Sequence, residues 1–284
     1  MISMVGLGNA ASGIVASFEN ISNYEVFYLN SQKNNAKNHF HIESYPSPEE
    51  YEKNIPNLKK FFKNINHRIQ VFITGASYSS NYSLGILEQL KDKEVDVFYI
   101  KPDIELLTGI PKLIENVVFG VLQEYARSGL LRSLTLLSNL NIENTLDQIP
   151  IKTYYETINN SIFSTVHYLN YFEFTEPEIG NIARPGPINR IRTIGILNVK
   201  NLEEKWLFDL DMERDVCYYI CINENRLATE GGLHRRIVEM LKKKPKNAFR
   251  RVSYAIYETP LSDFGFCVAH TNAIQKQKNL DSEE

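Results

Sequence analysis

Short apolar runs alternate with helix-like segments along the first half of this chain, and this alternation limits the fold more than any other feature. The apolar runs cover residues 1–6, 24–29, 69–73, 95–100 and 133–137. Segments with apolar residues at helical spacing lie at about 14–19, 48–64, 82–91 and 113–128, and residues 30–48 are polar and predict a loop. Continuous apolar strands separated by helices are typical of a parallel sheet covered on both faces.

The second half has a different pattern. Residues 151–171 predict a long helix with its apolar positions on one face, and a segment rich in proline and glycine follows at 177–187. Strand-like runs at 192–199, 216–223, 251–258 and 264–271 then surround one predicted helix at 230–243. We therefore expect an α/β protein with a parallel-sheet domain at 1–150, a central helix and acidic loop at 151–176, a smaller α+β domain at 177–274 and a disordered acidic tail at 275–284.

Composition excludes several classes of protein. The 284 residues suffice for a core of normal size, and a net charge of −3 gives no reason to expect direct nucleic-acid binding. The longest apolar runs are too short to cross a bilayer, and no Lys or Arg precedes residue 33, which argues against a secretory signal. Cys217, Cys221 and Cys267 lie in apolar runs and predict reduced core thiols; no His/Cys spacing suggests a zinc or other metal site. These features predict a cytoplasmic protein that does not bind membranes.

A glycine-rich turn, Gly6-Leu7-Gly8-Asn9-Ala10-Ala11-Ser12-Gly13, joins the first strand to the first helix. Exposed backbone N–H groups and the helix dipole at such a turn favour phosphate. The turn also matches the dinucleotide pattern G-x-G-x-x-A, but the second strand ends in Asn30-Ser31 where that reading expects an acidic residue. A phosphate site is favoured, with a plain tight turn and a nicotinamide site as the alternatives.

A second loop, Thr74 to Asn81, follows the third strand of the same predicted sheet. Ligands bind in doubly covered sheets at the carboxyl ends of the strands, where this loop lies. Its hydroxyl groups suit phosphate, and they suit a helix cap equally well.

Two pairs of residues mark the ends of the predicted central helix. Tyr155 and Asn159 are four residues apart and share a face, so the ring could stack on a base and the amide could read its edge; surface packing is the simpler interpretation. Glu173 and Glu176 are three apart, and we expect them at a helix start, where carboxylates polarise a water or simply stabilise the helix N-terminus.

Taken in order, these motifs resemble the tubulin/FtsZ family over nearly the whole chain. The resemblance implies that residues 1–150 bind GTP or GDP with Mg²⁺. It implies phosphate contacts from Gly6, Gly8, Asn9, Ala10 and Gly13 of the turn, and from Gly75, Ala76, Ser77, Ser79 and Ser80 of the second loop. It further implies that Asn139, Tyr155 and Asn159 bind guanine, and that Glu173 and Glu176 position the hydrolytic water in the neighbouring subunit. Subunits of this kind stack head to tail into filaments.

The chain also departs from the family pattern. The second loop reads Gly75-Ala76-Ser77-Tyr78-Ser79-Ser80 instead of consecutive glycines and a threonine, glutamates replace the usual paired aspartates, and one residue is inserted after Asn170. The chain is also short, which fits a divergent member of a phage or plasmid type. Two alternatives therefore remain open: a family-like fold that has lost hydrolysis or nucleotide binding and acts as a structural protein, and a nicotinamide-dependent oxidoreductase.

The last four residues, Asp281-Ser282-Glu283-Glu284, are mostly acidic. They could contact a basic patch on a neighbouring subunit, for which Arg235, Arg236 and Lys242–Lys244 are candidates; a solvated terminus is the simpler interpretation.

Overall fold

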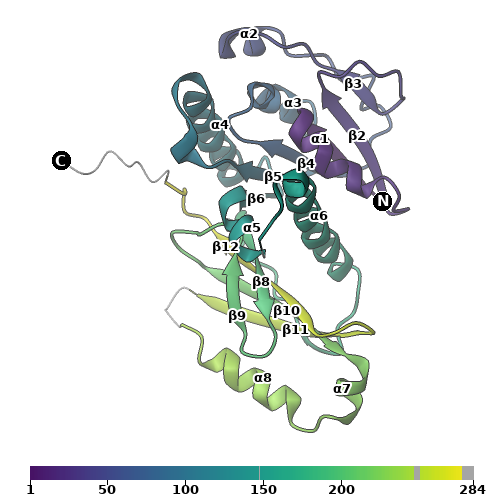
Figure 1. The fold of residues 1–284 in the computed structure, drawn as a ribbon, viewed down its shortest axis with the longest axis vertical. Helices are drawn as coiled ribbons and strands as arrows, with labels where there is room; N and C mark the ends of the chain where they lie inside the picture. Colours follow the sequence, from purple (N-terminus) through teal and green to yellow (C-terminus); the bar gives the residue numbers. More distant parts are fainter. Residues whose placement is uncertain (147, 246–249, 277–284) are drawn as a thin grey trace, which may run out of the picture.

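The structure is a computed structural model that describes residues 1–146, 148–245 and 250–276. Within these residues it contains one 12-stranded sheet in the order β3-β2-β1-β4-β5-β6-β8-β12-β10-β11-β7, with β9 paired to β8. Figure 1 shows α2 at one end of the molecule and α7 and α8 at the other. The acidic residues 281–284 lie outside the described residues.

The first half forms the parallel part of the sheet. Its strands are β1 (Ile2–Leu7), β2 (Tyr24–Asn30), β3 (His39–His41), β4 (Arg68–Thr74), β5 (Glu94–Lys101) and β6 (Ser133–Ser138). Each neighbouring pair among them runs parallel. All six strands therefore end at the same side of the sheet, which we call the carboxyl edge, and begin at the opposite side, the amino edge.

Helices cover both faces of this parallel part, as the apolar runs predict. On one face, Met4 and Phe72 pack with residues of α1 (Asn9–Val15) and α6 (Tyr154–Phe172). On the other, Val5 and Leu7 pack with residues of α3 (Ser83–Glu88), α4 (Gly109–Ser128) and α2 (Pro48–Lys53). Successive strand residues point to opposite faces, so two cores share one sheet.

Three local predictions for this half need correction. The helix expected over 48–64 ends at Lys53, because Pro56 lacks an N–H donor and its ring disfavours helical backbone in the preceding residue. Leu58 and Phe62 are still buried, but from turns. The polar stretch expected to be only loop contains β3, which pairs with β2 through Tyr28, Leu29 and Asn30. The helix expected over 82–91 is shorter and is preceded by a 3₁₀ turn, Tyr78–Tyr82.

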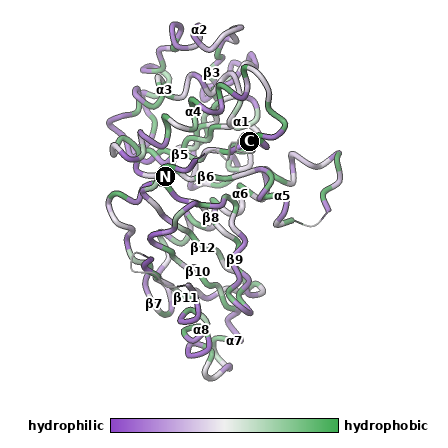
Figure 2. Tube along the Cα trace, turned by 90° about the vertical axis from the view of Figure 1, so that its left-hand side faces the viewer, coloured by the Kyte–Doolittle hydropathy of each residue, from purple (hydrophilic) through white to green (hydrophobic). Residues whose placement is uncertain are grey.

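The second half continues the same sheet. Strand β8 (Ile191–Asn198) pairs parallel with β6, and β12 (Phe264–Thr271), β10 (Asp215–Asn223) and β11 (Arg251–Thr259) follow it. These four strands confirm the predicted runs, whereas β7 (Ile179–Asn181) and β9 (Glu203–Trp206) are short edge strands that the pattern misses. Figure 2 shows β5, β6, β8, β12 and β10 following one another along the molecule.

Helices cover the second half of the sheet from both sides. The helix predicted at 230–243 is confirmed as α8 (Leu233–Lys242). A short helix that the pattern misses, α7 (Glu224–Thr229), precedes it, and Gly231 and Gly232, the latter at a φ of 77°, separate the two. Ile237 and Leu241 of α8 pack on one face, and Phe172 of α6 packs on Tyr257 and Phe266 on the other. The three cysteines are buried and form no disulfide, as predicted for core thiols. Among the described residues, no helix is long and apolar enough to span a membrane.

Candidate functional site

The two loops singled out in the sequence meet at the carboxyl edge. They follow β1 and β4, which are neighbouring strands in register from Ser3 and Ile69 onward. Gly8 has a φ of 89°, and a methyl group placed on it would collide with Ser79 Oγ. Ser79 Oγ in turn lies 2.7 Å from Ser77 Oγ. The glycine turn and loop 74–81 therefore form one continuous surface.

The residues of the glycine turn have separate structural roles. Gly6 is buried beneath α1: a Cβ there would lie 2.7 Å from Val15 Cγ2 and 2.9 Å from the Ala11 carbonyl oxygen. Gly6 thus allows α1 to approach β1. Asn9 and Ala10 open α1 and are exposed, and the first helical turn leaves its N–H groups without intrahelical partners. These N–H groups can receive an anion.

The end of β2 supports the turn. Asn30 Nδ2 donates to Ser12 Oγ at 2.9 Å, and Asn9 Nδ2 donates to Ser31 Oγ at 3.2 Å. Asn30 and Ser31 occupy the place where a dinucleotide site would have an acidic side chain for the ribose. The amide and hydroxyl found there instead hold the turn in place.

The start of α6 lies against the same surface. Asn159 Nδ2 is 3.1 Å from the position of a Cβ on Gly13. Tyr155, one helical turn earlier, is 77 % exposed. Tyr154 donates from its hydroxyl to Glu143 Oε2 at 2.8 Å and so ties α6 to α5 (Asn139–Thr145). Asn139 begins α5 directly after β6, so it lies at the carboxyl edge as well.

Loop 74–81 does not use its serines as a helix cap. No side chain caps the 3₁₀ turn at Ser77; instead Ser80 Oγ donates to the Ser77 carbonyl at 2.6 Å. Tyr78, which is bulky for a phosphate loop, packs against the core cluster with its ring 6.3 Å from that of Tyr51. Ser77 and Ser79 remain beside Gly8.

The acidic pair lies at the opposite end of α6. Glu173 is the C-cap of this helix and Glu176 lies beyond it, so the expectation of a helix start is wrong. The helix continues to Phe172 because its apolar positions face the sheet throughout. A helix of this length spans about 28 Å, which separates the two candidate sites.

Glu173 is engaged with arginines of its own chain. It forms ion pairs with Arg68 and, at 3.1 Å, with Arg132 Nη2. Arg132 also binds the buried Asp96, which accepts from Ser133 Oγ at 2.6 Å. Burial would raise the pKa of Glu173, but hydrogen bonding to Arg68 and the charges of both arginines lower the pKa below its ordinary value. Burial would likewise raise the pKa of Asp96, but the charges of Arg192 and Arg132 lower it below its ordinary value.

Glu176 has a different environment. It is exposed and makes no hydrogen bond or ion pair within the described residues. Two aromatic residues near it, Tyr171 and Phe174, are 54 % and 74 % exposed. This end of α6 therefore presents an available carboxylate beside exposed aromatic rings.

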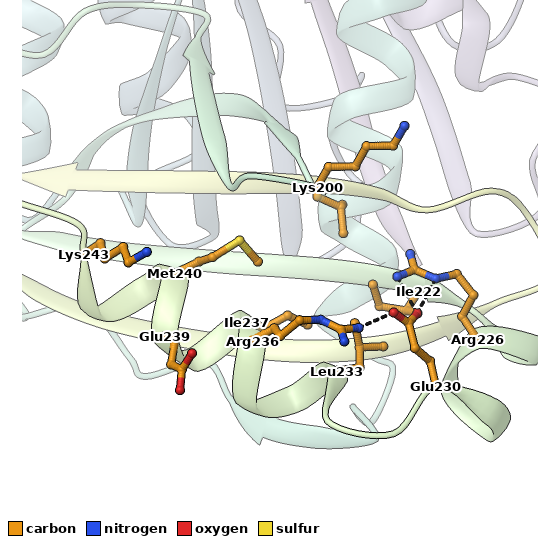
Figure 3. Close-up of a pocket in the computed structure, with 11 residues that line it drawn as sticks. Lys200, Ile222, Arg226, Glu230, Leu233, Arg236, Ile237, Glu239, Met240 and Lys243 are labelled. Carbon is orange, nitrogen blue, oxygen red and sulfur yellow. Dashed lines mark hydrogen bonds and ion pairs between the residues drawn. The ribbon is translucent and has the colours of Figure 1, made fainter.

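Cavities formed by the described residues also lie away from the carboxyl edge. One of about 940 Å³ opens beside the Glu173 cluster and is lined by Arg192 and the buried His270, among others. Another, of about 350 Å³, lies between α8 and Lys200, where Glu230 bridges Arg226 and Arg236 (Figure 3).

The proposed basic patch on α8 is partly neutralised within the chain. Arg236 pairs with Glu230, Arg235 Nε lies 3.1 Å from Glu239 Oε1, and Lys244 Nζ lies 3.0 Å from Glu204 Oε1. Lys243 lines the cavity of Figure 3.

Comparison with known proteins bears on the fold. No family model and no curated protein matches the sequence. Among solved structures, the chain is similar to CetZ from Methanosaeta thermophila at 12 % identity and a TM-score of 0.66, covering 96 % of this chain and 86 % of that one. It is similar to an empty FtsZ dimer from M. jannaschii at 11 % identity and a TM-score of 0.63, covering 95 % of this chain and 88 % of that one. It is also similar to TubZ of Bacillus thuringiensis serovar israelensis, in a GTPγS-form protofilament, at 12 % identity and a TM-score of 0.67, covering 95 % of this chain and 86 % of that one. The mostly parallel sheet, the long central helix and these likenesses together show that the chain has the tubulin/FtsZ fold.

Proposed function

We propose that this protein binds a guanine nucleotide at the carboxyl edge and assembles head to tail into filaments. The observation that carries the proposal is the arrangement around α6. One end of this helix adjoins the two loops that meet at Gly8 and Ser79, and the other end carries the exposed Glu176. The fold shared with subunits of a TubZ protofilament supports it.

The phosphates would lie between the turn and loop 74–81. The N–H groups that open α1 at Asn9 and Ala10, together with the hydroxyls of Ser77 and Ser79, are donors of the kind that bind phosphate. Gly8 permits the close approach, since any side chain there would fill the space beside Ser79.

The base would lie at the start of α6. Tyr155 offers an exposed ring for stacking, and Asn159 on the same helical face offers an amide for the edge of guanine. Asn139, at the carboxyl end of β6, would add a second amide.

Mg²⁺ would be bound chiefly through the nucleotide. It keeps several waters and prefers substrate phosphates to sites made by protein alone. The described residues contain no group of three His, Cys, Asp or Glu side chains suited to a metal, while Ser77 and Ser79 bring hydroxyl oxygens to the proposed phosphate position. When bound, the ion would supply positive charge to the phosphates.

Assembly would use the two ends of α6. Large apolar side chains are exposed near its start and the neighbouring loops, where Leu106, Ile110 and Ile151 lie, and near its end, where Tyr171 and Phe174 lie. Different patches at opposite ends favour a heterologous contact, which produces open filaments.

Hydrolysis, if retained, would need a carboxylate from the next subunit. Glu176 suits this role better than Glu173, because Glu173 already binds Arg68 and Arg132. A free carboxylate can orient a water toward the terminal phosphate.

The second candidate is a structural protein that has lost nucleotide binding or turnover. The altered loop favours it: the Gly75 N–H donates to the Ile100 carbonyl at 2.9 Å, and Ala76 stands where a glycine is expected. A nicotinamide-dependent oxidoreductase gains no support from the fold, and the end of β2 lacks the acid that such a site expects.

The test mixes the purified protein with GTP and Mg²⁺ and follows light scattering and phosphate release. Scattering with release supports a filament-forming GTPase. Scattering that needs GTP but occurs without release supports assembly without turnover. No scattering and no GTP-dependent rise in melting temperature would favour the structural protein, and stabilisation by NADH alone the oxidoreductase.

A further inference from the structure

A buried polar cluster lies directly beneath loop 74–81. Its members are Tyr99 and Lys101 of β5 and Glu115 of α4, of which Tyr99 and Glu115 are fully buried and Lys101 is 9 % exposed. Tyr99 donates from its hydroxyl to Glu115 Oε2 at 2.6 Å, and Lys101 Nζ lies 3.4 Å from Glu115 Oε1. The proposed nucleotide contacts do not include these residues.

The cluster determines the backbone of the loop above it. A Cβ on Gly75 would collide with Glu115 Oε2 and lie 2.6 Å from the Tyr99 hydroxyl. Glycine is therefore required at 75 by the buried carboxylate. The next residue, Ala76, has a φ of 55°, which is unfavourable for alanine, and its backbone is among the groups near the Glu115 carboxylate that lower the pKa of Glu115.

Within the described residues, the negative charge of Glu115 has one close cation. Lys101 provides it, and its ammonium also lies 3.9 Å from the centre of the Phe119 ring. Burial raises the pKa of Glu115 and lowers the pKa of Lys101, so each group depends on the other for its charge.

We propose that Glu115, held by Tyr99 and Lys101, is the positioning residue of the phosphate loop. It fixes the backbone conformation of loop 74–81 from the buried side, where the family pattern relies on consecutive glycines. The Glu115 carboxylate holds Ala76 in its left-handed conformation. This conformation directs Ser77 and Ser79 toward Gly8. The inference rests on the proposed nucleotide site for its consequence, but the effect on the loop backbone does not depend on any ligand.

The first experiment measures the loop without nucleotide. Amide exchange at Ala76 is followed by NMR or mass spectrometry in the wild type, in Glu115→Leu and in Glu124→Gln, a control on the exposed side of the same helix. We expect exchange at Ala76 to become about a hundredfold faster in Glu115→Leu and to stay unchanged in the control. Unchanged exchange in Glu115→Leu would overturn the proposal.

The second experiment separates loop positioning from general stability. Binding of GTPγS and of guanosine is measured by calorimetry or NMR titration in the same variants. We expect Glu115→Leu to weaken the binding of GTPγS about tenfold and to leave the affinity for guanosine unchanged, because only the phosphates contact the loop in the proposed site. An equal loss for both ligands would reduce Glu115 to a purely structural residue.

A milder variant guards against misfolding. Tyr99→Phe removes one hydrogen bond to Glu115 at almost constant volume, and we expect smaller changes in the same direction for both measurements. If Ala76 exchange responds but the wild type binds neither ligand, the nucleotide site is wrong and the positioning role stands. If the wild type binds GTPγS and neither variant alters Ala76 exchange, the positioning role is wrong.

Discussion

Glu173 Oε1 lies 3.1 Å from Arg132 Nη2, and the same guanidinium lies 2.9 Å from Asp96 Oδ2. One arginine therefore links the end of α6 to the amino edge of the sheet. The link gives the two glutamates of the acidic pair different expected roles, Glu173 in stability and Glu176 in assembly or turnover.

The Asp96→Asn substitution should destabilise the protein. Asp96 is fully buried and balances Arg132, so its loss leaves a partly buried guanidinium without its main partner. We expect the free energy of unfolding to fall by about 3 kcal/mol. Chemical denaturation measures this, with the exposed Asp209→Asn as the control. A loss no larger than that of the control would show that the buried pair contributes nothing.

The Glu176→Ala substitution should leave stability unchanged and affect turnover. The side chain is exposed and has no partner within the described residues, so we expect less than about 0.5 kcal/mol of change in unfolding. If the wild type hydrolyses GTP, the variant should still assemble but release phosphate far more slowly. Unchanged release would assign the water-positioning role to another residue.

The Gly8→Ala substitution tests the contact between the two loops. Alanine is disfavoured at a φ of 89° and would collide with Ser79 Oγ, so we expect about 1–2 kcal/mol of destabilisation and weaker GTP binding. Gly120→Ala is the matched control: it lies inside α4 with nothing within 4 Å, and we expect it to stabilise the protein by about 0.5–1 kcal/mol. Equal effects of the two substitutions would contradict the description of the turn.

The Tyr155→Ala substitution tests the base site. Because the ring is 77 % exposed, its removal should hardly change the melting temperature. Loss of a stacking partner should weaken GDP binding by about tenfold or more. Tyr171→Ala, at the other end of the same helix, should leave GDP affinity of the monomer unchanged; if it weakens GDP equally, the base does not lie at the start of α6.

The strands could be predicted because buried parallel strands are continuous apolar runs, as at Val95–Ile100, and need no knowledge of their neighbours. The break after Lys53 was also readable, from Pro56. The three edge strands β3, β7 and β9 were missed because they are short and contain few buried apolar residues; all three residues of β7 are exposed.

The site was only partly predictable for a related reason. Local motifs such as Gly8 and Tyr155 can be read from sequence, and parallel strands bring them to one edge. Glu115 could not be found, because a glutamate in an amphipathic helix normally faces water; it is buried here only because Gly75 leaves room for its carboxylate. The Glu173–Arg68 and Glu173–Arg132 pairs join residues far apart in the chain, which no spacing rule reveals.

His270 should make the protein less stable in mild acid. It lies on β12, is 7 % exposed, and faces Arg192 and Asp215 on neighbouring strands. Burial, with the charge of Arg192, lowers the pKa of His270 to about 3. An unfolded histidine has a pKa of about 6.5, so between these values the unfolded state binds one more proton and stability rises with pH.

The expected slope is about 1.4 kcal/mol per pH unit from this one group between about pH 6 and pH 4. The lowered pKa values of Asp96 and Glu173 add a further loss only as the pH falls below about 4, where unfolded carboxylates begin to bind protons. Urea denaturation at several pH values measures the slope. His270→Gln should make it clearly shallower above pH 4, whereas His234→Gln, on the exposed face of α8, should leave it as in the wild type. A slope that survives His270→Gln would mean that another buried group takes up the proton on unfolding.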